Sequence, residues 1–197
     1  MRRTLTALRA ASLFALAMAM ASAAPCTAAE PAPPVVTEQE VKVEHANGGF
    51  SIDLVMLARV PLGVAWAVLT DFDRMAEFIP NLSHSQVFQR NDNQLKISQK
   101  GLVHWGLLTM NFESVREVTL VPQREIRTHG LSGTIKRVDS SMALEAEGEG
   151  TRLRYHTEVD PGSWFPPLLG PAKVRQETAA QFSAILQEMQ RRQAAAQ

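Results

Sequence analysis

Apolar and polar residues alternate through the middle of this chain. From Phe50 to Val60 every second residue is apolar, and the residues between them are polar except Val55 and Leu57. A period of two residues predicts a strand with one buried face. Pro61 ends the strand, and the helical spacing of apolar residues over 62–69 predicts a short helix.

A second short helix is predicted directly after the first. Thr70 and Asp73 form a Thr-x-x-Asp pair that can cap it, and Pro80 stops it. Beyond Asn81 the alternation returns in segments separated by Asn, Asp, Gly and Pro. The predicted strands are 84–90, 94–103, 107–121, 124–131, 135–147 and 151–159. Connections this short make neighbouring strands antiparallel.

The last predicted element is a helix from about Pro171 to Arg192. At about 1.5 Å per residue it spans about 33 Å, enough to cross a sheet. One side of this helix is apolar and the other is polar. The apolar residues are Val174, Phe182, Ile185, Leu186 and Met189, and the polar ones are Lys173, Glu177, Gln187, Glu188 and Arg191.

This order of elements predicts an α+β fold with the helices on one side of a single sheet. We expect a curved antiparallel sheet of about seven strands, with a further short strand near 41–44, two short helices and a long C-terminal helix. A bent sheet and a straight helix cannot touch everywhere. An apolar cavity should remain between them, where small ligands usually bind.

Strand parity indicates which polar side chains face this cavity. On 107–121 the apolar positions are even, which places Ser114 and Arg116 on the inward face. Arg116 could clamp a carboxylate or phosphate, or it could lie at the rim with its head in water. Tyr155, Thr157 and Ser140 are inward by the same argument. They could orient a ligand or hydrogen-bond one another.

The first 23 residues have the three parts of a secretory signal peptide: three arginines, an apolar stretch over 10–20, and Ala21-Ser22-Ala23. The apolar stretch is shorter than the about 20 residues of a spanning helix, so we expect a periplasmic or secreted protein. Stable membrane insertion after cleavage is not expected, and transient membrane contact stays open. An uncleaved anchor or cleavage after Ala29 are the alternatives.

Residues 24–40 are rich in proline and acid and lack periodicity, which predicts a flexible tether. The folded domain is then expected over 41–192, with a tail at 193–197. Without its leader the chain would carry 17 basic and 20 acidic residues, a formal charge of −3, which argues against nucleic-acid binding. Cys26 is the only cysteine, so no internal disulfide can form.

The sequence predicts no metal site and no cofactor. The five histidines lack the spacing of a zinc site, and parity places His129 and His156 on the exposed face of their strands. Asp71-x-Asp73 is better explained by helix capping than by metal binding. No nucleophile elbow, phosphate loop or dinucleotide fingerprint is present.

Four short phrases and the order of elements resemble the START-like (SRPBCC) helix-grip superfamily, in particular its bacterial polyketide cyclase/dehydrase and coenzyme Q-binding-like branch. The phrases are Trp66 to Phe72 (WAVLTDF), Phe78 to Leu82 (FIPNL), Gly150 to Tyr155 (GTRLRY) and Trp164 to Pro171 (WFPPLLGP). The resemblance implies the helix-grip fold of the birch pollen allergen. It also implies a cavity in which members bind sterols, quinones, polyketides or fatty acids.

Large apolar residues placed as a cavity wall are the candidate ligand contacts. They are Phe78, Ile79, Trp105, Met110, Phe112, Met142, Tyr155, Trp164, Phe165, Leu168, Leu169 and Phe182. We expect an exported carrier that encloses a hydrophobic small molecule or lipid, such as a quinone, fatty acid, isoprenoid or polyketide-like compound. A cyclase or dehydratase acting in the same cavity is the alternative, with Tyr155 and Arg116 as its candidate catalytic groups. A groove that docks a protein partner is a third hypothesis, with the partner unknown.

Overall fold

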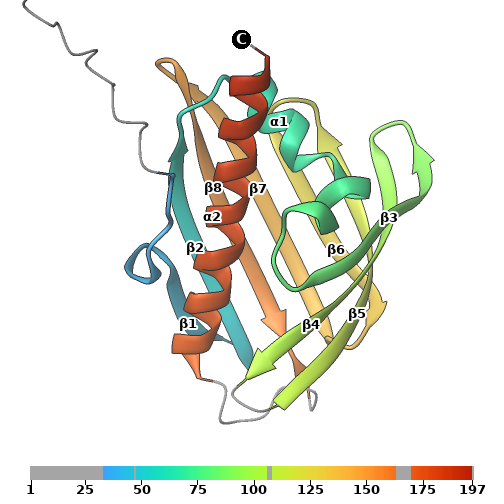
Figure 1. Ribbon diagram of the computed structural model, residues 1–197. Coiled ribbons are helices and arrows are strands. Elements are labelled where there is room, and N and C mark those ends of the chain that lie inside the picture. The colour runs from blue at the N-terminus through green and yellow to red at the C-terminus, as the bar shows by residue number, and fades with distance from the viewer. Residues whose placement is uncertain (1–32, 47, 106–107, 163–169, 197) are drawn as a thin grey trace, which may run out of the picture. The chain divides into compact units, whose positions relative to one another are not determined.

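The computed structural model describes residues 33–46, 48–105, 108–162 and 170–196, and the predicted signal peptide lies outside them. The domain of residues 33–196 is an eight-stranded antiparallel sheet with helices on one side (Figure 1). The strands are β1 (Lys42–Ala46), β2 (Gly49–Ala58), β3 (Leu82–Asn91), β4 (Gln94–Trp105), β5 (Leu108–Val121), β6 (Glu125–Gly133), β7 (Arg137–Glu147) and β8 (Gly150–Asp160). The helices are α1 (Leu62–Leu69) and α2 (Pro171–Ala195), with short 3-10 turns η1 (Glu38–Glu40) and η2 (Phe72–Glu77).

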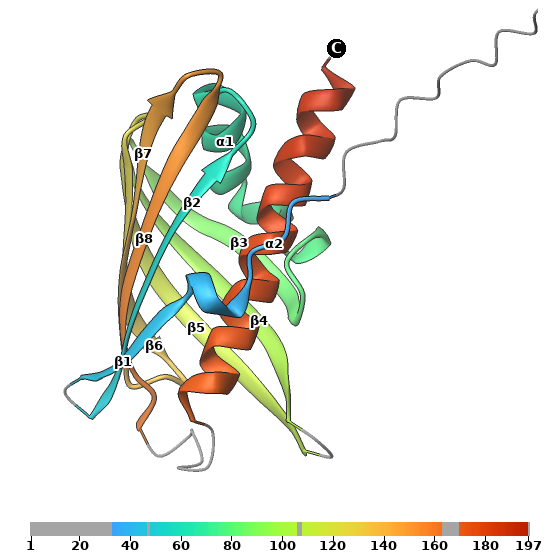
Figure 2. The ribbon, with the colours of Figure 1, turned by 90° about the vertical axis from the view of Figure 1, so that its left-hand side faces the viewer.

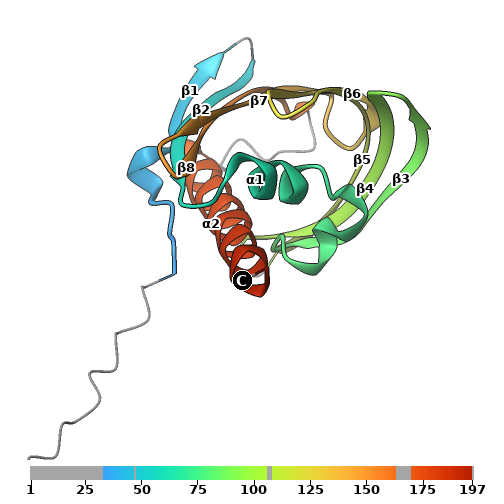
Figure 3. The ribbon, with the colours of Figure 1, turned by 90° about the horizontal axis from the view of Figure 1, so that it is seen from above.

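The predicted helix-grip fold is confirmed. The strand order is β1-β2-β8-β7-β6-β5-β4-β3, so the N-terminal hairpin pairs with the last strand. The sheet curls around the side that carries α1, η2 and α2, as the view from above shows (Figure 3). From the side, α2 runs along the concave face (Figure 2). The eighth strand is β1, at the place of the further short strand expected near 41–44 beside the about seven others.

Strand alternation determines what the sheet buries. On β2, Leu54 and Met56 are buried on the concave face, whereas Val55 and Leu57 are half exposed on the other. The same parity buries Val118 on β5 and Leu153 on β8. One apolar core therefore joins the concave face to α1 and α2.

The predicted cap of the second short helix is wrong. The Thr70 hydroxyl donates back to the Trp66 carbonyl of α1 at 2.8 Å, and the Asp73 carboxylate accepts the Val87 backbone N–H of β3 at 2.7 Å. Both side chains have the chemistry of a cap, but each finds another partner. Asp73 therefore fastens η2 to the edge of the sheet.

The packed domain begins before Val41, the boundary expected from the sequence. Val36 is buried, its backbone N–H donates to the Ser183 hydroxyl at 2.8 Å, and the Pro34 carbonyl accepts from Gln187 at 3.4 Å. The chain from Pro34 onward is thus held against α2. The tether prediction fails here because the partners lie about 150 residues away in sequence, beyond any local pattern.

Candidate functional site

A cavity of about 340 Å³ lies between the concave face of the sheet and α2. Its volume falls in the range of about 300–1,000 Å³ typical of small-molecule sites. The wall is mostly apolar and comes from β2 to β8, from the end of α1 and the segment after it, and from α2. Among the lining residues are Phe72, Met75, Ile79, Ile97, Phe112, Ile126, Ile135, Val138, Met142, Phe182 and Ile185. Such a wall favours the burial of an apolar ligand at about 25 cal/mol per Å².

Five of the twelve predicted contacts line the cavity: Ile79, Phe112, Met142, Tyr155 and Phe182. Phe78 packs against the core beside it, and Met110 lies on β5 but outside the lining. The Trp105 side chain and the segment with Trp164, Phe165, Leu168 and Leu169 lie outside the described part of the chain. For all twelve residues, contact with a ligand stays a prediction.

Arg116 faces the cavity and does not lie at the rim, the alternative that the sequence left open. Its Nε donates to the Ser114 hydroxyl at 2.7 Å. Burial lowers the pKa of Arg116, and the neighbouring Tyr155 acts in the opposite direction. The residue still keeps some accessible surface. The lowered pKa and the remaining accessible surface are both explained if the guanidinium is exposed to the cavity and not to bulk water.

Tyr155 joins the aromatic wall to the polar groups of the cavity. Its ring lies 4.7 Å from the Phe182 ring, centroid to centroid, which ties β8 to α2. Burial raises the pKa of the Tyr155 hydroxyl, while a hydrogen bond with Thr157 and the Arg116 charge lower it. The net upward shift keeps the phenol protonated at neutral pH. Tyr155 can therefore donate a hydrogen bond to a ligand but cannot serve as a base.

A line of hydroxyl groups crosses the cavity floor beside Arg116. The strand register places Thr128 of β6 opposite Ser140 of β7, and Ser140 opposite Thr157 of β8. All three line the cavity. The Thr157 hydroxyl donates to the Asp139 carbonyl at 2.9 Å. The sheet therefore presents a polar strip within an otherwise apolar wall.

Sequence reasoning missed several polar residues of the lining, among them Gln99 and Glu177. Gln99 is buried and donates to the Ser85 hydroxyl at 3.1 Å, so its amide is already engaged. Glu177 of α2 lies 2.5 Å from the Lys173 ammonium and accepts from the Asn81 amide at 3.0 Å. The i,i+4 spacing of Lys173 and Glu177 was the available signal. The sequence analysis assigned Glu177 to the polar side of the helix and therefore did not predict its position at the cavity.

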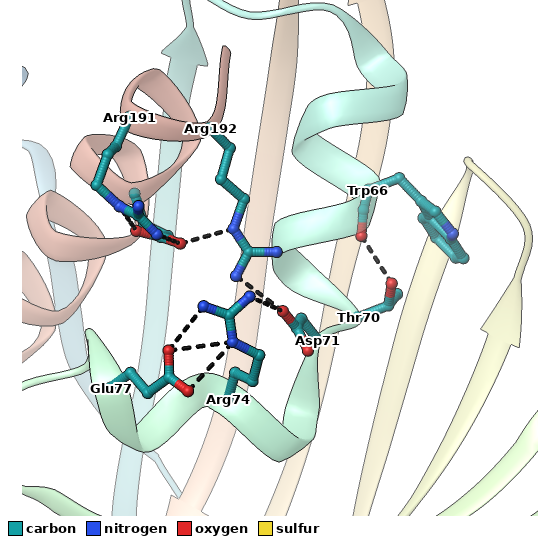
Figure 4. Close-up of polar contacts among 8 residues, drawn as sticks. Trp66, Thr70, Asp71, Arg74, Glu77, Arg191 and Arg192 are labelled. Carbon is teal, nitrogen blue, oxygen red and sulfur yellow. Dashed lines mark hydrogen bonds and ion pairs between the residues drawn. The ribbon is translucent and has the colours of Figure 1, made fainter. Parts of the chain in front are cut away.

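A network of ion pairs anchors the C-terminal half of α2 (Figure 4). Glu188 is buried and accepts from Arg191 Nε and Arg192 Nε, each at 2.6 Å. The Arg192 guanidinium also lies 2.8 Å from Asp71 at the start of η2. The placement of Glu188 on the exposed side of the helix was therefore wrong, because these arginines let a carboxylate lie against the core.

The convex face of the sheet is polar. His129 pairs with Asp139 at 2.6 Å and His156 with Asp53 at 2.8 Å, and both histidines are exposed as predicted. A hollow of about 360 Å³ lies on this face. It is open to solvent and has charged walls, so it lacks the enclosure that distinguishes the cavity under α2.

The described residues contain no group of three or more His, Cys, Asp or Glu side chains placed to hold a metal ion. No helix within them is long and apolar enough to cross a membrane.

Comparisons with known proteins agree with this geometry. The family described as "Polyketide cyclase / dehydrase and lipid transport" matches residues 59–186. A STAR-related lipid transfer protein from Xanthomonas axonopodis has a similar fold, with a TM-score of 0.67 and 15% identity over 76% of this chain and 92% of its own. No curated protein sequence matches this chain.

Two further solved structures share the fold at low identity. The Zhui aromatase/cyclase from a Streptomyces species has a TM-score of 0.56 and 14% identity, over 74% of this chain and 96% of its own. A START superfamily protein from Mycobacterium smegmatis has a TM-score of 0.57 and 12% identity, over 75% and 99%. At these identities the likeness extends to the fold alone.

Proposed function

The chain belongs to the polyketide cyclase/dehydrase and lipid transport family, and on that premise we propose that it is an exported carrier of a hydrophobic small molecule or lipid. The observation that carries the proposal is the mostly apolar cavity of about 340 Å³ between the sheet and α2. Apolar burial would drive binding, and Arg116, Tyr155 and the hydroxyl strip would set the ligand's orientation. Export is supported by the signal-peptide pattern of residues 1–23.

Native purification tests the carrier. The full chain would be produced in a Gram-negative host and recovered from the periplasmic fraction, and organic-solvent extraction followed by mass spectrometry would identify what it holds. We expect a hydrophobic compound to copurify near one per protein. A chain that stays in the cytoplasm contradicts export. A repeatedly empty protein with no affinity for dodecanoate, dodecanol or decylubiquinone contradicts the carrier.

A cyclase or dehydratase is the second candidate function, favoured by the meeting of Tyr155, Arg116 and Glu177 at one cavity. Such chemistry needs a positioned proton donor and acceptor. The protonated Tyr155 would donate, and Glu177 would be the acceptor. If a turnover of a polyketide-like substrate is found, Tyr155→Phe should lower kcat about 100-fold or more. An unchanged kcat would exclude Tyr155 as the proton donor of the reaction.

A further inference from the structure

Arg116 has no counter-charge among the residues that the structure describes. None of the described residues places a carboxylate within ion-pair distance of its guanidinium, and its hydrogen bond goes to the neutral Ser114 hydroxyl. Arg192 offers the contrast, because it is also withdrawn from solvent but meets both Glu188 and Asp71. Holding a cation away from water without a partner costs free energy. A ligand that supplies the missing negative charge would recover that cost.

Arg116 can balance one negative charge of a ligand. Arg116 is the only basic residue among the described residues that line the cavity. Glu177 is the acidic one, and Lys173 and Asn81 already engage its carboxylate. The Ser114 hydroxyl accepts a hydrogen bond only from Nε of Arg116. The two terminal nitrogens of the guanidinium therefore remain available as a planar pair of donors. This pair of donors can form two parallel hydrogen bonds to the two oxygens of a carboxylate.

The cavity beside Arg116 offers further partners for such a group. Arg116, Thr128 and Ser140 line the same open volume, whereas the Val138 side chain fills the space at Gly130, the residue opposite Arg116 on β6. Thr128 is the diagonal neighbour on the same face, because it pairs with Val118 two residues along β5. Among the described residues, the Thr128 and Ser140 hydroxyls take part in no side-chain hydrogen bond, so both can meet a ligand oxygen.

We propose that the ligand of this cavity is a carboxylate-bearing amphiphile of the fatty-acid class, with its carboxylate on Arg116 and its hydrocarbon chain along the apolar wall. The proposal rests on the carrier function proposed above. The carboxylate would pair with the terminal guanidinium nitrogens and meet the hydroxyl strip at Thr128 and Ser140. The chain would run along Ile97, Phe112 and Phe182, which line the cavity.

Calorimetric titration with three probes of equal chain length tests the proposal: dodecanoate, dodecanol and dodecyl phosphate. We expect the full chain to bind dodecanoate about tenfold or more tightly than dodecanol, since hydrogen bonds to charged groups are the stronger ones. Dodecyl phosphate should bind no tighter than dodecanoate, because Arg116 is the one cation that faces the cavity in the described part of the chain. Arg116→Gln should lower the affinity for dodecanoate to that for dodecanol and leave the affinity for dodecanol unchanged.

The exposed Arg124, in the turn between β5 and β6, provides the matched control. Arg124→Gln should retain the full preference for dodecanoate. The thermal midpoint of ligand-free Arg116→Gln should be no lower than that of the original chain, because the variant loses an unpaired charge. The preference of the unaltered chain for dodecanoate over dodecanol does not depend on any variant folding.

The outcomes separate this inference from the carrier itself. Equal binding of dodecanoate and dodecanol, or a preference that survives Arg116→Gln, overturns the carboxylate assignment and leaves a neutral-ligand carrier. Tighter binding of dodecyl phosphate overturns it in favour of a phosphate headgroup. Failure of every hydrophobic probe to bind overturns the carrier and this inference together.

Discussion

Tyr155 shows how a single side chain can have two roles in this fold. Its ring packs on Phe182 of α2, and its hydroxyl lies near Thr157 and Arg116 in the cavity. The ring contributes to packing whether or not a ligand is present. The hydroxyl can instead change partners when a ligand oxygen arrives.

The titration of Tyr155 can be observed directly, because it is the only tyrosine of the chain. Burial raises its pKa above the ordinary 10.0, so the ultraviolet titration of the folded protein should have its midpoint above pH 10. In denaturant the midpoint should return to about 10. A folded-state midpoint at or below 10 would contradict the burial of the hydroxyl.

The same shift has a consequence for stability. Above pH 10 the unfolded chain releases the phenol proton while the folded chain retains it, so the unfolded state binds fewer protons. Stability should therefore decrease as pH rises above 10, and Tyr155→Phe should remove this part of the decrease. Thermal melts of both proteins between pH 8 and about 11 would measure the difference.

At the scale of elements, α2 is divided between two tasks. Its N-terminal half, with Glu177, Thr178, Gln181, Phe182 and Ile185, covers the cavity. Its C-terminal half holds the network of Glu188 with Arg191 and Arg192, which reaches Asp71 of the α1–η2 segment (Figure 4). One end of the helix is thereby anchored while the other faces the cavity.

Loss of Glu188 should loosen the anchored end. Glu188→Gln leaves the arginines without a buried carboxylate and should lower the free energy of unfolding by about 2 kcal/mol at pH 7. Chemical denaturation would measure it. Glu77→Gln is the matched control, because Glu77 pairs with Arg74 at the surface and its loss should cause no measurable change. Equal effects of the two substitutions would show that the network does not anchor α2.

The effect of Glu188 should depend on pH in a defined direction. The hydrogen bond from Arg191, with that from Arg192, lowers the pKa of Glu188 below its ordinary 4.5, against the opposing effect of burial. A depressed pKa stabilises the fold above the ordinary value, and this contribution is lost as pH falls through the folded-state value. The difference between the original chain and Glu188→Gln should thus be complete at pH 7 and shrink below about pH 4.5.

At the scale of the described domain, the proposed function depends on incomplete contact between the curved sheet and α2. The sheet curls around the side where α2 lies (Figure 3). The cavity of about 340 Å³ is the volume that the side chains of the sheet and α2 leave unfilled. The core beside it is fully packed, with Leu153 and Met189 at 0% exposure. The core and the cavity wall share residues such as Ile97, Met142 and Phe182, so the proposed binding site is built on the packed core.

Filling the cavity should abolish binding without unfolding the domain. Ser140→Phe introduces a ring into the middle of the hydroxyl strip, where open volume already exists, so the cost of overpacking should stay within about 1–3 kcal/mol. Calorimetry should then detect no dodecanoate binding, while circular dichroism stays that of the original chain. Ser141→Phe, on the opposite face of β7, is the control and should bind normally. Undiminished binding by Ser140→Phe would place the ligand elsewhere.

Much of the fold follows from local pattern. The alternation over Phe50 to Val60 predicted β2 and its buried face, the spacing over 62–69 predicted α1, and turn residues separated the later strands. Parity also placed Arg116, Tyr155 and Ser140 inward, because a strand's side chains alternate whatever the sheet does next. The missed features depend on partners distant in sequence. Asp73 bonds to β3, Val36 to α2, and Glu188 belongs to a network that reaches Asp71.

The sequence by itself determined the order of elements, the face that each strand buries and the chemistry available on that face, since these follow from periodicity and residue type along the chain. Only the tertiary structure decided that Arg116 faces the cavity with no carboxylate paired to it among the described residues, while Arg192 pairs with two. Charge pairing and cavity volume depend on distances between residues far apart in sequence. The curvature of the sheet against a straight helix sets those distances.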